Sequence, residues 1–159
     1  HIHAAAFRLL GRPQFSERQV AAFATHVYSE GYTSALSDAS RSGSLLGAWL
    51  ERNLIGTAGW SPADGVGMVA RIRWLFVRPL FTHLGVGTML LAEAERRALQ
   101  AGFGTFAAEV PLSAVDFFTR FGYNITSHGL RPLPNVEGMA VAFLRKSVRP
   151  DGNAGETGA

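Results

Sequence analysis

The segment that decides the fold is RWLFVRPLFTHLGVGTMLL, which runs from Arg73 to Leu91. It starts as an apolar run with aromatic and β-branched residues, typical of a strand, and this run ends at Pro79. Gly85 and Gly87 follow, and the residues after them are apolar at helical spacing. A helix start offers free backbone N–H groups and a partial positive charge, and glycine lets a phosphate reach them. The segment therefore predicts a strand, a loop that binds a pyrophosphate through its main chain, and a helix.

The same two glycines could instead serve only the turn and the packing of the helix, because a short Gly-x-Gly pattern has low specificity. Two better-known phosphate loops are excluded. A P-loop needs a lysine followed by Ser or Thr after its last glycine, and this loop contains no lysine. A dinucleotide-binding fingerprint needs a third glycine at position 90, which is Leu90, and it belongs to a doubly wound parallel sheet.

Hydrophobic periodicity and turn residues predict the elements on either side of this segment. Ser16 and Gln19 have the spacing of a capping box at the start of a helix. The helix after the two glycines has the clearest pattern, because its apolar residues share one face. In chain order we expect a strand at 4–10, a helix at 15–32, a loop at 33–44, a hairpin at 45–62, a strand at 68–79, a helix at 86–100, a strand at 105–111, a helix at 113–123 and a strand at 139–144. This βα-βββ-αβ-αβ order predicts an α+β fold.

Length and composition fit one domain with a sizeable core. The chain has 159 residues, 47% of them hydrophobic, and we expect a domain over 1–146 and a small, polar, disordered tail over 147–159. The formal charge is only +3 and there is no run of like charges, which argues against nucleic-acid binding. No apolar run reaches the roughly 18 residues of a membrane span, and no secretory signal is visible. The absence of cysteine excludes disulfides, thiolate metal sites and a cysteine nucleophile, and it fits a cytoplasmic protein.

Two motifs resemble one known family. Residues 75–103, LFVRPLFTHLGVGTMLLAEAERRALQAGF, resemble the acetyl-CoA-binding segment of the GCN5-related N-acetyltransferase (GNAT) superfamily. That segment is a strand with a Val-x-Pro-like step, then Gln/Arg-x-x-Gly-x-Gly/Ala, then a long helix. Residues 113–123, SAVDFFTRFGY, are similar to the family's Ala-x-x-x-Tyr-x-x-x-Gly-Phe helix. The likeness covers roughly residues 6–146, and it implies a mixed, splayed sheet of six or seven strands flanked by helices.

The resemblance also implies a co-substrate and a reaction. Acetyl-CoA would bind between two splayed strands, and its acetyl group would pass directly to an amine in a ternary complex, with no metal. The strand end would pair with the pantetheine arm, and the N–H of Val77 would steady the thioester oxygen. The cofactor-binding residues implied in this way are Phe76, Val77 and Arg78 at the strand end, Thr82, His83, Leu84, Gly85, Val86, Gly87 and Thr88 in the loop, and Ser113, Phe117 and Phe118 beside the thiol.

Three positions depart from the family pattern. Thr82 stands where the loop usually has Gln or Arg, and Leu84 stands where a basic or polar residue is common. The phosphate grip then rests more on the backbone, with His83 as a possible extra contact. Phe118 stands at the tyrosine that many members use to protonate the departing thiolate, and phenylalanine has no proton to donate.

The residues leave the base and the acceptor open. Glu109 ends the strand after the long helix and is the first candidate for the base, although it could equally be a solvated or paired carboxylate. His3 is expected to be mobile, and no His, Asp or Glu spacing suggests a metal site. Tyr32 lies in the region that shapes the acceptor pocket in the family. Arg71 and Arg73 could bind an acidic acceptor or form the solvated face of a strand.

Three functional hypotheses follow from these observations. The first is an acetyltransferase that uses acetyl-CoA and a small-molecule or peptide amine, with no nucleic acid and no membrane as partner, and with homodimerisation possible. The second is a catalytically weak acyl-CoA-binding sensor or regulatory domain of the same fold, which Phe118 and Thr82 favour. The third is an unrelated α/β binding domain in which the glycines serve only packing. The sequence does not reveal the acceptor or the preferred acyl length.

Overall fold

The computed structural model describes residues 1–10, 15–63 and 68–148. Its centre is a six-stranded sheet with the order β1-β2-β3-β4-β6-β5, in which β3 and β4 are parallel and the other neighbours antiparallel. The strands are β1 (Leu45–Leu50), β2 (Asn53–Pro62), β3 (Val69–Val77), β4 (Thr105–Pro111), β5 (Asn124–Leu133) and β6 (Val136–Ser147). The helices are α1 (Ile2–Leu10), α2 (Glu17–Val27), α3 (Glu30–Arg41), α4 (Val86–Gln100) and α5 (Val115–Arg120). The predicted α+β class, with a mixed sheet of six or seven strands, is confirmed.

The segment predicted as a first strand is helix α1, so that prediction was wrong. Its sequence, AAAFRLL, contains three alanines and two leucines, which are strong helix formers, and it lacks the alternation that marks a half-buried strand. Phe7 stacks on Phe23 of α2 with ring centroids 3.9 Å apart, and Ala4 is buried in the same cluster. Residues 2–10 therefore pack as a helix against α2 and do not pair as a strand in the sheet.

The predicted long helix is divided into two, and the predicted loop after it is helical. The capping box of Ser16 and Gln19 starts α2 as expected. However, α2 ends at Val27, and the Ser29 hydroxyl accepts a hydrogen bond from the N–H of Tyr32 to cap α3, which continues to Arg41. The small polar residues of this stretch favour turns by local preference, which is why a loop was predicted. The missed signal was Ser29, a favourable N-cap residue at the start of α3.

The end of the chain also differs from the prediction. Strand β5 was missed, because most of its side chains are exposed and it pairs only with β6. Strand β6 is twice as long as the predicted strand over 139–144, since it has 12 residues. The helix predicted over 113–123 is shorter: Ser113 lies in the 3₁₀ turn Leu112–Ala114, and α5 follows from Val115 to Arg120.

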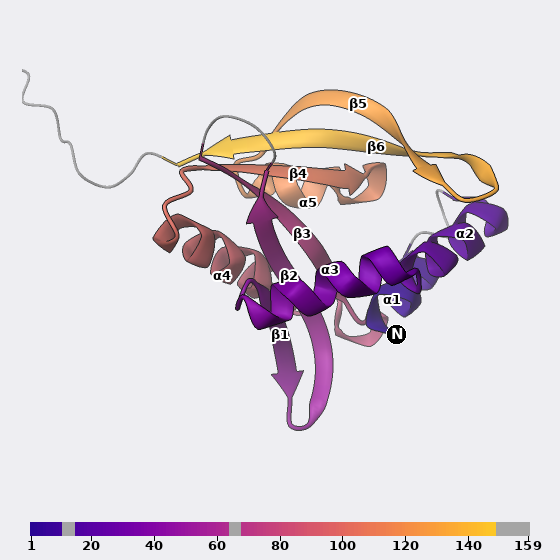
Figure 1. Ribbon diagram of the computed structural model, residues 1–159, viewed down its shortest axis with the longest axis horizontal. Coiled ribbons are helices and arrows are strands. Elements are labelled where there is room, and N and C mark those ends of the chain that lie inside the picture. The colour runs from indigo at the N-terminus through magenta and orange to yellow at the C-terminus, as the bar shows by residue number, and fades with distance from the viewer. Residues whose placement is uncertain (11–14, 64–67, 149–159) are drawn as a thin grey trace, which may run out of the picture.

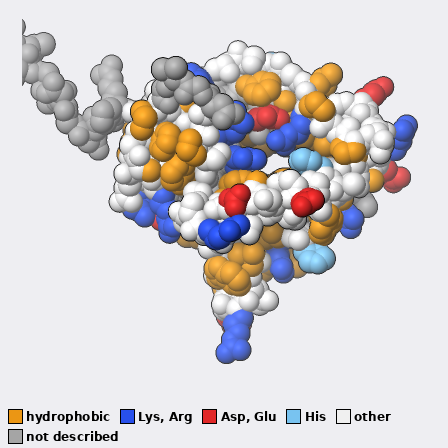
Figure 2. All heavy atoms as spheres, viewed as in Figure 1, with side chains coloured by type: hydrophobic (Ala, Val, Ile, Leu, Met, Phe, Trp, Pro, Cys, Tyr) orange, Lys and Arg blue, Asp and Glu red, His pale blue; other side chains and the backbone are white. Residues whose placement is uncertain are grey.

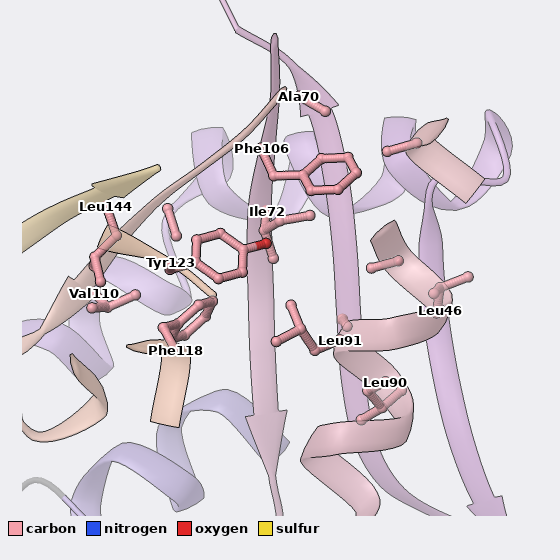
Figure 3. Packing of buried hydrophobic residues seen from close by; sticks show 14 of the residues in the cluster. Leu46, Ala70, Ile72, Leu90, Leu91, Phe106, Val110, Phe118, Tyr123 and Leu144 are labelled. Carbon is pink, nitrogen blue, oxygen red and sulfur yellow. The ribbon is translucent and has the colours of Figure 1, made fainter. Parts of the chain in front are cut away.

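Two cores fill the two faces of the sheet. Helices α4 and α5 cover one face, where Leu90 and Leu91 of α4 and Phe118 of α5 belong to one buried cluster with Ile72, Phe106 and Val110 of the strands (Figure 3). Helices α1 and α2 cover part of the other face, where a second cluster joins them to β5 and β6. These two layers of helices hold the sheet between them (Figure 1).

The sheet divides between β3 and β4. These parallel strands pair only from Val69–Ile72 to Thr105–Ala108, whereas β4 stays paired with β6 as far as Pro111. The register of β3 against β2 slips at Trp74, which has a positive φ of 56°. A bulge of this kind bends and twists its strand. Figure 1 shows the result: β1, β2 and β3 run roughly from top to bottom of the view, whereas β4, β5 and β6 run from side to side.

Candidate active site

The main chain of β3 is open where it leaves β4. The N–H of Arg78 donates a hydrogen bond of 2.8 Å to the carbonyl of Ile55 on β2. Because successive residues of a strand direct their N–H and C=O groups to opposite sides, those of Val77 point toward the split. The pairing with β4 has ended five residues earlier, so Val77 has an edge that an extended ligand can pair with.

The loop that follows ends at a helix start without a side-chain cap. A 3₁₀ turn (Pro79–Phe81) is closed by the Thr82 hydroxyl, which donates a 2.8 Å hydrogen bond to the Pro79 carbonyl. His83 and Gly85 have positive φ values of 61° and 83°, and Gly85 is the N-cap of α4 with no side-chain hydrogen bond. The predicted bounds of the helix are confirmed. Its first N–H groups are therefore available to an anion.

Three elements meet at the first turn of α4. A Cβ added at Gly87 would lie 3.5 Å from the ring of Phe117 on α5 and 3.7 Å from Val77 on β3. By contrast, a Cβ at Gly85 would meet nothing within 4 Å. The strand end, the glycine loop and the motif helix α5, which are separate in the sequence, are thus neighbours in the fold.

A further glycine of this region was not predicted from the sequence. A Cβ on Gly56 of β2 would lie 2.8 Å from Leu90 of α4 and 3.2 Å from the carbonyl of Phe76. Gly56 therefore permits α4 to pack closely on the strands that lead to the split. Its contact with Leu90 of α4 joins residues that are far apart in the sequence, so no local pattern could indicate it.

The remaining loop and helix residues divide by exposure. The side chains of His83, Leu84, Thr88 and Ser113 are exposed, whereas Phe118 is buried. Phe118 packs edge-on against Tyr123 with ring centroids 5.1 Å apart (Figure 3). Of the two phenylalanines assigned to the thiol end, Phe117 is therefore the one beside the glycine loop.

Glu109 lies at the beginning of the split. It follows Ala108, the last residue of β4 paired with β3, and its carboxylate forms an ion pair of 3.0 Å with Arg131 of β5. The side chain keeps 24% of its surface exposed. Glu109 is therefore a paired carboxylate, which is one of the alternatives that the sequence left open.

His3 is buried, so the prediction that it is mobile was wrong. Only 4% of its surface is exposed, and its ring stacks on Phe76 with centroids 4.4 Å apart. Its Nδ1 and Nε2 atoms each lie 2.8 Å from a hydroxyl oxygen, of Tyr32 and Thr57 respectively. Burial, and then the positive chain terminus, lower its pKa from 6.5 to about 4.

These hydrogen bonds have one consistent direction. The Thr57 hydroxyl donates to the Trp74 carbonyl at 2.7 Å, because a carbonyl can only accept. Thr57 must then accept from the Nε2–H of neutral His3, and Nδ1 must accept the hydroxyl proton of Tyr32. This series of hydrogen bonds links α3 and α1, through β2, to the bulge of β3. No sequence pattern indicated this link.

The space-filling view shows a hollow in the face that carries α3 (Figure 2). Lys and Arg side chains lie along its upper and left edges, with acidic and histidine side chains elsewhere at its rim. Within the described part of the chain, no cluster of three or more His, Asp or Glu residues could hold a metal ion. Over the same residues, every helix is too short or too polar to cross a membrane.

Comparisons with known proteins agree on one family. The model of the "Acetyltransferase (GNAT) family" matches residues 7–123. A search of curated protein sequences gave no match. Among solved structures, a GCN5-related N-acetyltransferase from Rhodopseudomonas palustris is 26% identical, with a TM-score of 0.76 over 92% of this chain and 86% of its own.

Two further structures show the fold with a ligand. PaiA N-acetyltransferase from Thermoplasma acidophilum, in complex with coenzyme A, is 19% identical, with a TM-score of 0.71 over 92% of this chain and 88% of its own. The structure of yncA from Salmonella typhimurium with its cofactor acetyl-CoA is 12% identical, with a TM-score of 0.63 over 80% of this chain and 78% of its own. With the split sheet and the uncapped helix start at its edge, the family match leads to one conclusion: the chain belongs to the GNAT acetyltransferase family.

Proposed function

We propose that this protein binds acetyl-CoA at the split between β3 and β4 and transfers the acetyl group directly to an amine. The single observation that carries the proposal is the open edge of Val77 beside the uncapped start of α4. An extended pantetheine arm can pair with that edge, while a pyrophosphate suits a helix N-terminus. Both needs of one ligand are met within one continuous segment of chain.

In this proposal the main chain holds the co-substrate. Val77 pairs with the pantetheine arm through its main chain, with Phe76 and Arg78 on either side of it, because the N–H of Arg78 is already bonded to Ile55. The loop residues 83–88 hold the pyrophosphate through their N–H groups. Thr82 contributes no free hydroxyl proton, because that proton is donated to the Pro79 carbonyl. The exposed His83 side chain can add a contact with a phosphate oxygen. Phe117 and Ser113 border the thiol end.

The chemistry requires attack of a neutral amine nitrogen on the thioester carbonyl. The Val77 N–H stabilises the oxyanion, the C–S bond then breaks, and the thiolate of coenzyme A leaves. Glu109, directly or through a water, accepts the proton that the amine loses. Phe118 offers no acid, and its burial in the core keeps it away from a polar role, so we assign protonation of the thiolate to solvent.

Calorimetric titration with acetyl-CoA tests the binding, with two matched variants. Gly85 and Gly43 both have a positive φ and both have open space where a Cβ would stand. Trp at either position therefore causes the same backbone strain, but only Gly85→Trp fills the start of α4. We expect micromolar binding by the native chain and by Gly43→Trp, and at least a tenfold loss in Gly85→Trp. Equal binding by all three would refute the proposed site.

Turnover separates the enzyme from a binding module. Release of coenzyme A in the presence of an amine panel supports transfer, whereas tight binding of acetyl-CoA without turnover supports the sensor or regulatory alternative. The buried Phe118 supplies no acid, which favours the sensor or regulatory alternative. Transfer nevertheless remains chemically feasible, because substrate positioning and a backbone oxyanion donor act without a tyrosine. Cytoplasmic location, the domain limits 1–146 and homodimerisation stay predictions, and residues 149–159 of the predicted tail lie outside the described residues.

A further inference from the structure

Three arginines and one carboxylate come together on the face of the sheet opposite α4. Arg71 and Arg73 alternate with Ile72, which is buried in the α4 core, so they point to the other face. Arg131 of β5 reaches Glu109 on that face. The hollow in Figure 2, which Lys and Arg side chains border along its upper and left edges, lies over the same part of the sheet.

Glu109 is the carboxylate that raises the pKa of Arg73, and this single negative charge cannot balance the three arginines. Arg73 is half-buried, and within the residues that the structure describes its guanidinium forms no ion pair or hydrogen bond. The guanidinium instead lies over the ring of Trp74, 4.4 Å from the centroid. Burial, and then the nearby Arg71 and Arg131, lower the pKa of Arg73. A cation held in this way is costly, and an anionic ligand would relieve the cost.

The other polar groups at this place do not supply the missing negative charge. Burial raises the pKa of Tyr32, although Arg131 and Arg73 act in the opposite direction, so its hydroxyl is neutral. Burial, and then Arg131, lower the pKa of His26, which is therefore also neutral at pH 7. The group keeps a net positive charge, next to the open part of β3.

We propose that the amine acceptor carries a carboxylate or phosphate group, and that Arg73, together with Arg131, binds this anion. The inference deepens the proposed acetyl transfer and rests on it, because it names the substrate class of the same split. Arg73 and Val77 are four residues apart on β3, so their Cα atoms lie at most roughly 13 Å apart at the usual strand rise. The Arg73 side chain is long, and Glu109, the proposed base, lies 3.0 Å from Arg131, so the acceptor length that suits both groups is measured with acceptors of increasing length.

Anion binding can be measured without knowing the acceptor. Inorganic phosphate and acetate are titrated separately into the intact protein, and the indole N–H signals are followed by NMR. The chain has only three tryptophans, so Trp74→Phe identifies the signal of the ring beneath Arg73. We expect a saturable shift of the Trp74 signal, about tenfold weaker in affinity in Arg73→Gln and unchanged in Arg52→Gln, which removes a charge in the distant β1–β2 turn. The anion with the higher affinity, phosphate or acetate, identifies the group that the site prefers.

The turnover experiment uses paired acceptors. Linear ω-amino carboxylates of increasing length are compared with their amides, and O-phosphoethanolamine with ethanolamine. We expect the anionic member to have at least a tenfold higher kcat/KM, and Arg73→Gln to abolish the preference while the calorimetric affinity for acetyl-CoA is unchanged.

The two proposals fail in different ways. An absence of acetyl-CoA binding would refute the proposed function but leave the anion titration readable. Normal acetyl-CoA binding without a saturable Trp74 shift would refute the acceptor inference alone. An equal loss in Arg73→Gln and Arg52→Gln would also refute it, because only general electrostatic attraction would then remain. A preference for the neutral acceptors would contradict it directly.

Discussion

The buried His3 predicts that the fold is sensitive to mild acid. Its imidazole is enclosed between Phe76, Tyr32 and Thr57, and its pKa is lowered from 6.5 to about 4, first by burial. Between these two values the unfolded chain binds a proton at His3 that the folded chain does not. The free energy of unfolding therefore falls as the pH drops below about 6.5, and this contribution levels off below about 4.

The size of this effect follows from the shift in pKa. A shift from 6.5 to about 4, at about 1.36 kcal/mol for each pKa unit, corresponds to about 3 kcal/mol of stability. This is a large part of the 5–15 kcal/mol that is typical of a folded domain.

Urea unfolding between pH 7.5 and pH 4 measures this quantity. The native chain is compared with His3→Gln, which has no titrating group, and with Tyr32→Phe, which loses one partner but keeps the buried imidazole. We expect Tyr32→Phe to follow the steep pH dependence of the native chain and His3→Gln to lose about 3 kcal/mol less on acidification. Parallel curves for the native chain and His3→Gln would refute the reasoning.

Three further substitutions test separate parts of the structure. Gly85→Ala should lower the free energy of unfolding by about 1 kcal/mol, because Gly85 has a φ of 83°, and an unchanged urea midpoint would contradict this conformation. Glu95→Gln should cost about 2 kcal/mol, since the carboxylate accepts from Tyr123 and pairs with Lys146 at 2.8 Å; thermal unfolding measures it, and a stabilised variant would oppose the assignment. Phe118→Tyr should destabilise by about 1–3 kcal/mol without raising turnover, and a gain in kcat would instead place this ring beside the thiol.

The sequence by itself determined the elements whose signals are local. Pro79 ends one element, Gly85 can adopt a positive φ, and the apolar residues after it share a helical face, so the strand, loop and helix over 73–100 were predicted with their correct order. The capping box at Ser16 is local in the same way. Local signals failed where propensity was weak or contrary, as in the short polar side chains of α3 and the exposed strand β5.

Only the tertiary structure decided how the site is assembled. The split depends on the bulge at Trp74, and that bulge is held by a hydrogen-bond chain through Thr57 to His3, which is 54 residues away from Thr57 in the sequence. Glu109 and Arg131 meet because β4 and β5 both flank β6. Contacts of this kind arise from packing and pairing between distant segments, and neither periodicity nor residue type within one segment carries information about them.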